Sequence, residues 1–267
     1  MSAPPRNPLA PPTVADGRLL GFDLTGRRAI VYGAETTLGG AIIDAFREAG
    51  ATVGVTSTST DGAVLFALKK AAAGGPAEAT DLRNATNVQV STRKLAKALG
   101  SLDVGVVIPE AVAVAPIGRT ASADYGAIIA GNLTVTYNVF RSLAKELAGK
   151  RPAGRLIVVL SPHAVRGVAG ASAYAAGQAG VLGLVRSLSQ ELAPQGTTVN
   201  AIVTGWLDDS PANSPDRDDD TLERHIPLGR FGRPDEIAPL AVYLASAASG
   251  FLTGQAFYVD GGLLNRS

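Results

Sequence analysis

Three polar residues in the second half of the chain have a spacing that suits proton transfer. Tyr174 and Gln178 are four residues apart in a segment, 171–192, that is predicted to be helical, so their side chains share one face about 6 Å apart. Ser161 lies thirteen residues before Tyr174, directly after the apolar run 155–160. A serine at a strand end and a tyrosine in the first turns of the next helix can converge on one point. Tyr174 can donate a proton there, which makes this stretch a candidate acid–base site.

The elements that would position these residues alternate between strand and helix. The run 27–32 predicts a strand, 33–40 a glycine-bearing turn, and 41–49 an amphipathic helix closed by Gly50. The alternation continues, with strands expected at about 51–56, 76–80, 102–108, 155–160, 197–203 and 251–262, and helices at about 88–99, 122–147, 171–192 and from 230 onwards. We therefore predict an α/β fold in a single domain: a Rossmann-like, doubly wound parallel sheet with helices on both faces.

Composition and charge narrow the classes of function. The formal net charge of +1 argues against a surface that binds nucleic acid or a membrane. The absence of cysteine excludes a disulfide and a thiolate nucleophile, and with only two histidines a metal site is not expected. The chain has no run of eighteen apolar residues, and its first residues form no apolar signal core. We therefore expect a cytoplasmic protein.

Two segments lack the periodicity of helices and strands. Residues 1–22 carry five prolines within the first twelve positions, which is typical of an extended, flexible tail. Residues 208–225 begin with a highly charged stretch and predict a mobile loop in the substrate region. The globular domain is accordingly expected to span residues 23–267.

Several segments resemble the short-chain dehydrogenase/reductase family. The similarity extends over about residues 24–262 and includes Ser161 and Tyr174, which match the family's Ser and Tyr-x-x-x-Lys active site except that Gln178 stands at the lysine position. The C-terminal part resembles the 3-oxoacyl-[acyl-carrier-protein] reductase branch through segments 230–238, 244–246, 253–255 and 259–262, in that order. The resemblance implies carbonyl reduction or alcohol oxidation on a small molecule with a nicotinamide cofactor.

The resemblance assigns catalytic roles to four positions. It implies that Ser161 polarises the substrate oxygen, that Tyr174 passes the proton, and that Asn132 holds a water in the relay. The family's lysine binds the nicotinamide ribose and lowers the pKa of the tyrosine, because an ammonium within about 4–6 Å favours the phenolate. Gln178 is neutral and cannot do this, so Tyr174 would be a slower relay.

No lysine follows Lys150 that could take over this role. His163 and Arg166 are the nearest cations in the sequence, but neither has helical spacing from Tyr174. We expect His163 to line the cleft as a loop residue rather than to act as a base.

The cofactor-binding turn departs from the family pattern. Gly33 and Gly39 match its glycines, but Thr37 stands at the middle glycine, where the backbone approaches the pyrophosphate, and its side chain takes room there. Residues 107–110 replace the family's Asn-Asn-Ala-Gly, and Gly205 follows a threonine where the family has proline. We therefore expect weak dinucleotide binding.

The cofactor itself stays open between NAD and NADP, because 56–60 offers neither the acidic group nor the arginine that distinguishes them, although Glu35 disfavours a 2′-phosphate. Asp81 has two interpretations, as a residue beside the adenine or as a helix N-cap. The positions that the resemblance assigns to cofactor binding are Gly33, Thr37, Leu38, Gly39, Ser57, Thr58, Asp81, Leu82 and Gly205.

Three functions are compatible with these features. The first is an oxidoreductase of the family's type, with weak or altered cofactor binding and catalysis. The second is non-redox chemistry by Ser161 and Tyr174 in the same pocket. The third is a non-catalytic subunit of an oligomer of this family. The resemblance also implies a homo-oligomer, a tetramer or dimer, built on two long helices and the C-terminal strand.

Overall fold

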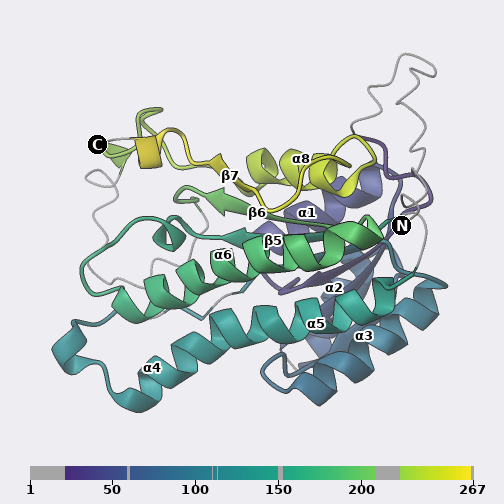
Figure 1. Ribbon diagram of the computed structural model, residues 1–267, viewed down its shortest axis with the longest axis horizontal. Helices are drawn as coiled ribbons and strands as arrows, with labels where there is room; N and C mark the ends of the chain where they lie inside the picture. The colour runs from purple at the N-terminus through teal and green to yellow at the C-terminus, as the bar shows by residue number, and fades with distance from the viewer. Residues whose placement is uncertain are drawn as a thin grey trace, which may run out of the picture.

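One seven-stranded parallel sheet organises the chain, in the order β3-β2-β1-β4-β5-β6-β7, with helices on both faces (Figure 1). The computed structural model describes residues 22–58, 61–109, 111–112, 114–149, 153–208 and 223–265. The strands are β1 (Arg28–Tyr32), β2 (Thr52–Ser57), β3 (Ala77–Ala79), β4 (Val104–Val107), β5 (Arg155–Leu160), β6 (Thr198–Thr204) and β7 (Ala256–Val259). The fold predicted from the sequence is confirmed.

The α-helices of the described residues are α1 (Thr37–Glu48), α2 (Gly62–Ala71), α3 (Ala85–Leu99), α4 (Ser122–Ile129), α5 (Val135–Leu147), α6 (Ser172–Leu192) and α8 (Pro234–Ala245). Shorter helical turns are η2 (Ile117–Arg119), η3 (Ala130–Thr134), η4 (Pro162–Ala164), η5 (Ala193–Gln195) and η6 (Leu263–Asn265).

The central strands are apolar on both faces because helices cover both sides of the sheet. In β5, Leu156, Val158 and Leu160 pack in one core with side chains of α3, α5 and α6. Ile157 and Val159 point to the other face and pack in a second core with α1, α2 and α8. This alternation follows from the two-residue period of a strand.

The strand order reverses between β1 and β4, which are neighbours in the sheet although two other strands separate them in the sequence. In sheets of this kind, ligands bind outside the carboxyl ends of the strands at such a reversal. Gly33 follows β1, Ser161 follows β5 and Gly205 follows β6. The fold therefore places these residues along one edge of the sheet.

Three elements differ from the sequence prediction. Helix α2 has no counterpart among the expected elements, because Leu68 is its one buried residue and the segment lacks an apolar period. The helix expected over 122–147 is interrupted by η3, which is a π-helical turn. The last strand covers β7 alone, because Gly254 has a φ of 73° and Asp260 caps a turn by accepting from the Gly262 N–H.

The predicted tail and most of the predicted loop lie outside the described residues, which begin at residue 22 and omit 209–222. Among the residues that are described, no helix is long and apolar enough to cross a bilayer. The same residues contain no group of three or more histidine, cysteine, aspartate or glutamate side chains placed to hold a metal ion.

Candidate active site

Ser161 stands where β5 meets a short helical turn. It is the N-cap of η4, and its hydroxyl accepts a hydrogen bond from the His163 N–H at 3.3 Å. Pro162 occupies the first position of the turn, where its missing N–H costs nothing. The Ser161 Oγ also lies 3.4 Å from His163 Nδ1. The turn therefore brings an imidazole against the serine hydroxyl.

Tyr174 and Gln178 lie on the buried face of α6, one turn apart, as the sequence spacing predicts. The Tyr174 ring packs against the His163 ring, with centroids 5.2 Å apart and planes inclined by 56°. His163 thus contacts both Ser161 and Tyr174. The residue was expected in a loop, but it lies in the helical turn η4, where it is placed to exchange a proton with the serine hydroxyl.

The pKa of His163 is lowered, first because burial disfavours the charged imidazolium and second because Arg166 repels a second positive charge. The neutral imidazole is therefore favoured, and one of its ring nitrogens can accept a proton. Arg166 itself lies over Trp206, with its guanidinium carbon 5.8 Å from the ring centroid.

Gln178 links two of the candidate catalytic residues through its side-chain amide. Its Nε2 donates to Asn132 Oδ1 at 2.8 Å, and its Oε1 accepts from the Ser161 N–H at 3.0 Å. Gln178 and Asn132 are both fully buried. Sequence reasoning treated Gln178 only as a missing lysine and did not find this bridge, because the bridged residues are far apart in the chain.

The backbone fixes the direction of these hydrogen bonds at both ends. Asn132 Nδ2 donates to the carbonyl oxygens of Ala111 and Ile128, each at 2.8 Å, so Asn132 Oδ1 must face Gln178. At the other end, the Ser161 N–H can only donate. The residue between them must donate to one side and accept from the other, which an amide side chain does and lysine or glutamate does not.

Two glycines of α6 let this helix approach η3 closely. A Cβ at Gly177 would lie 3.1 Å from the Asn132 Cβ, and one at Gly180 would lie 3.0 Å from Leu133 Cδ2. The π-helical turn η3 carries Asn132 toward α6, and such turns are frequent at functional sites. Gly177 and Gly180 therefore serve the packing of α6 against η3 within one chain.

The glycines of the turn after β1 are required by close backbone contacts. Gly33 has a φ of 80°, and a Cβ there would lie 2.3 Å from the Ile108 carbonyl oxygen. A Cβ at Gly39 would lie 2.7 Å from the Gly33 carbonyl oxygen. Tyr32 is the last residue of β1 before this turn, and its hydroxyl lies 2.7 Å from Thr92 Oγ1 in the core on the α3 side. The Tyr32 ring therefore lies in the core and does not fill the turn.

The start of α1 is suited to a phosphate. Thr36 is the N-cap and accepts from the Gly39 N–H at 2.7 Å. The helix provides no acceptor for the N–H groups of Thr37 and Leu38, its first two residues. The Thr37 side chain is exposed and Leu38 is buried. The turn therefore keeps its N–H donors, with a branched side chain beside them.

A carboxylate joins this turn to the end of β2. Glu35 Oε1 accepts from the N–H of Thr58 at 2.8 Å and from its hydroxyl at 2.6 Å. Glu35 Oε2 is buried without a hydrogen-bond partner in the described part of the chain. Ser57, the last residue of β2, is buried. An unpaired buried carboxylate oxygen is suited to a hydroxyl donor from a ligand.

The remaining predicted cofactor residues lie farther along the sheet edge. Asp81 and Leu82 follow β3, two strands away from β1. The N-cap of α3 is Asn84, and Asp81 instead accepts from the Arg83 N–H at 3.0 Å, so the N-cap interpretation of Asp81 is wrong. At the other end, a Cβ at Gly205 would lie 2.8 Å from the Asp260 Cα, which explains the glycine by packing.

Known proteins share this architecture and much of the sequence. Residues 33–264 match the family described as enoyl-(acyl carrier protein) reductase, whose model is that of the short-chain dehydrogenases. The chain belongs to the short-chain dehydrogenase/reductase family. It is 32% identical over 244 residues to the 3-oxoacyl-[acyl-carrier-protein] reductase FabG of Vibrio harveyi, and the match covers 91% of this chain and 99% of that protein.

Solved structures agree with this assignment. The chain is similar to a dehydrogenase/reductase from Sinorhizobium meliloti 1021, with 31% identity, a TM-score of 0.81, and coverage of 91% of this chain and 97% of that one. A second similar structure is a Beutenbergia cavernae protein described as an NAD(P)-dependent gluconate 5-dehydrogenase, with NADP bound at low occupancy. The identity is 30% and the TM-score 0.82, and the match covers 92% of this chain and 100% of that one.

The chain therefore belongs to an oxidoreductase family, and one of the similar structures holds NADP. These relatives do not favour the two alternatives, non-redox chemistry and a non-catalytic subunit. The features of this site that carry the proposals below are the Gln178 bridge, the imidazole beside Ser161 and the Glu35 carboxylate in the turn after β1.

Proposed function

We propose that the chain interconverts a carbonyl and an alcohol on a small molecule, with a nicotinamide dinucleotide and a slower proton relay than its lysine-containing relatives have. The observation that supports this is the convergence of Ser161 and Tyr174 on His163, with hydrogen bonds that tie Ser161 through Gln178 to Asn132. The family's substrate-facing hydroxyls are present, and the side chain that would supply the positive charge is not.

Each residue has a distinct part in this proposal. The Ser161 hydroxyl donates a hydrogen bond to the substrate oxygen, and Tyr174 gives or takes the proton at that oxygen. A bound nicotinamide supplies or accepts the hydride. Gln178 holds the Ser161 backbone against Asn132 but carries no charge, so it does not favour the phenolate form of Tyr174. The expected consequence is a low rate rather than a different reaction.

We further propose that the preferred cofactor is NAD rather than NADP. The N–H groups at the start of α1 would hold the pyrophosphate. The unpaired oxygen of Glu35 is suited to accept from a ribose hydroxyl and would repel a 2′-phosphate. The Thr37 side chain takes up space at the start of α1, where the pyrophosphate would bind, so we propose that both dinucleotides bind weakly. Thr37→Gly should then tighten their binding.

Titration with all four nicotinamide dinucleotides, followed by thermal shift and by fluorescence, tests the proposed cofactor. Oxidation or reduction is then followed by absorbance of the dinucleotide with ketones, alcohols and 3-oxoacyl thioesters. We expect measurable turnover that Tyr174→Phe and Ser161→Ala each abolish. Turnover that survives both substitutions, or no binding of any dinucleotide even by Thr37→Gly, would reject the proposal.

A homo-oligomer, tetramer or dimer, and a cytoplasmic location remain part of the proposal. Exposed tyrosines on α4, α5 and β7, namely Tyr125, Tyr137 and Tyr258, support an assembly surface on the elements that the family resemblance indicates. A stable monomer in sedimentation at micromolar concentration would exclude this assembly.

A further inference from the structure

Arg166 is a cation beside the candidate site with no anionic partner among the described residues. It lies five residues after Ser161, and its N–H donates to the Pro162 carbonyl at 2.9 Å. Its side chain is half-buried, and its guanidinium lies over the ring of Trp206. A guanidinium over an aromatic face is attracted to the ring without using its N–H groups as hydrogen-bond donors, so they are available to a ligand.

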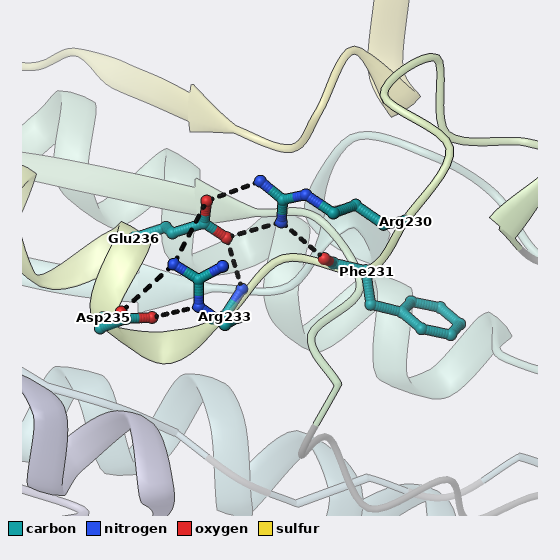
Figure 2. A network of polar contacts seen from close by, with 5 residues as sticks. All are labelled: Arg230, Phe231, Arg233, Asp235 and Glu236. Carbon is teal, nitrogen blue, oxygen red and sulfur yellow. Dashed lines mark hydrogen bonds and ion pairs between the residues drawn. The ribbon is translucent and has the colours of Figure 1, made fainter.

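Other arginines near the end of the sheet are neutralised within the chain. Figure 2 shows Arg230 and Arg233 facing two carboxylates at the start of α8. Arg230 Nη2 lies 2.7 Å from Glu236 Oε1, and Arg233 Nε lies 3.0 Å from Asp235 Oδ1. These arginines already have their counter-charges. Arg166 differs from them in lying over an aromatic ring and not against a carboxylate of the described residues.

Arg166 lies close enough to the reacting groups to act on their charge. Its charge contributes to the lowered pKa of His163, whose ring nitrogen lies 3.4 Å from the Ser161 Oγ. Trp206, over which Arg166 lies, packs against a small buried cluster of Ile226, Phe231 and Leu263 and is thereby held in place. A molecule whose oxygen reaches Ser161 would therefore lie near the positive charge of Arg166.

We propose that Arg166 binds an anionic oxygen group of the substrate, a carboxylate or a phosphate, so that the protein acts on oxo acids or hydroxy acids in preference to neutral ketones or alcohols. A planar guanidinium matches such groups with two parallel hydrogen bonds, which adds orientation to charge. The inference rests on the proposed function for the reaction, but it makes a claim about binding that needs no turnover.

Matched compounds test the charge requirement. One pair is 4-oxopentanoate and 2-pentanone, which differ in a terminal carboxylate, and the other is hydroxyacetone phosphate and hydroxyacetone. Calorimetry measures their binding to the full chain with and without dinucleotide. We expect the anionic member of at least one pair to bind about 10- to 100-fold more tightly, the range expected for charge-assisted hydrogen bonds. The pair that responds distinguishes carboxylate from phosphate.

Arg166→Gln should abolish this difference and raise KM for the anionic compound, with KM for the neutral compound and kcat within about twofold. Arg93→Gln on α3, which removes a 70% exposed arginine side chain, is the control and should change neither value. The proposal is overturned if the wild type binds both members of each pair alike, or if Arg166→Gln weakens both alike. It is also overturned if the variant loses dinucleotide affinity, because Arg166 would then serve the cofactor.

The binding measurement separates this inference from the proposed reaction. If the wild type discriminates by charge through Arg166 and no compound is turned over, the reaction is wrong and the anion site stands. If turnover occurs without charge discrimination, the reaction stands and the anion site is wrong.

Discussion

Replacing Gln178 by lysine is expected to raise activity and lower stability. The variant places an ammonium one helical turn from Tyr174, on the same buried face of α6. A neighbouring positive charge lowers the pKa of a tyrosine by about 1–3 units, which corresponds to about 1.4–4 kcal/mol in favour of the phenolate. The ammonium would also donate to the nicotinamide ribose. We therefore expect carbonyl reduction to become about tenfold faster or more.

The same substitution removes a hydrogen-bond acceptor. Gln178 Oε1 accepts from the Ser161 N–H at 3.0 Å, and lysine offers no acceptor in its place, although it can still donate to Asn132 Oδ1. A buried donor left without a partner costs about 1–3 kcal/mol. Position 178 has no exposed surface, so removing the ammonium from water adds to that cost. The free energy of unfolding should fall by at least this amount.

Both effects can be measured on the same proteins. Urea unfolding gives the stability, and dinucleotide absorbance with ketones and 3-oxoacyl thioesters gives the rate. Gln178→Met is the control, because its length is similar but it supplies neither the hydrogen bonds nor the charge; it should lose stability without gaining activity. The measurement is repeated with Thr37→Gly, so that cofactor entry does not limit the rate.

Two results would refute this reasoning. The first is a wild-type rate typical of the family together with no gain, or a loss, of rate in Gln178→Lys. The Gln178 amide would then be part of a working proton relay, and the missing lysine would not limit the rate. The second is a variant with both Thr37→Gly and Gln178→Lys that neither binds a dinucleotide nor reduces any compound. The pocket would then differ at more than these two positions, and the proposed slow reductase activity would be wrong.

Other perturbations test the imidazole, the carboxylate and the helix contact. The pKa of His163 is lowered in the folded state, so the wild type should lose stability relative to His163→Gln as the pH falls below about 6.5 toward that lowered pKa. The same dependence of the unfolding free energy on pH in both proteins, from pH 8 to 5, would contradict this. Glu35→Gln should raise the affinity for NADPH relative to NADH by about tenfold or more in fluorescence titrations, since a like charge is removed, and an unchanged ratio would place the ribose elsewhere. Gly177→Ala should destabilise the protein by about 1–3 kcal/mol, because its Cβ would lie 3.1 Å from the Asn132 Cβ. Gly183→Ala, with no atom within 4 Å of the added Cβ, is the helix control and should keep or raise the melting temperature.

The architecture could be predicted from the sequence because it depends on short-range patterns. Apolar runs such as 155–160 and the amphipathic segment after Gly33 indicate strands and helices by their period, and their alternation implies a parallel sheet. The spacing of Ser161 and Tyr174 placed both residues in one site for the same reason, since a strand end and the next helix are joined by one connection. Helix α2 was missed because its exposed sequence carries no such period.

The contacts that give this site its character depend on pairs of residues that are distant in the chain. Gln178 and Asn132 are 46 residues apart, and Glu35 and Thr58 are 23 apart. Whether Gln178 is a lost charge or a bridge depends on which donors and acceptors face it, and that was decided by the π-helical turn at Asn132 and the glycines that let α6 approach it. A side-chain amide has the same sequence signature in either role, because hydrogen bonds are directional and their partners are set only when the helices pack.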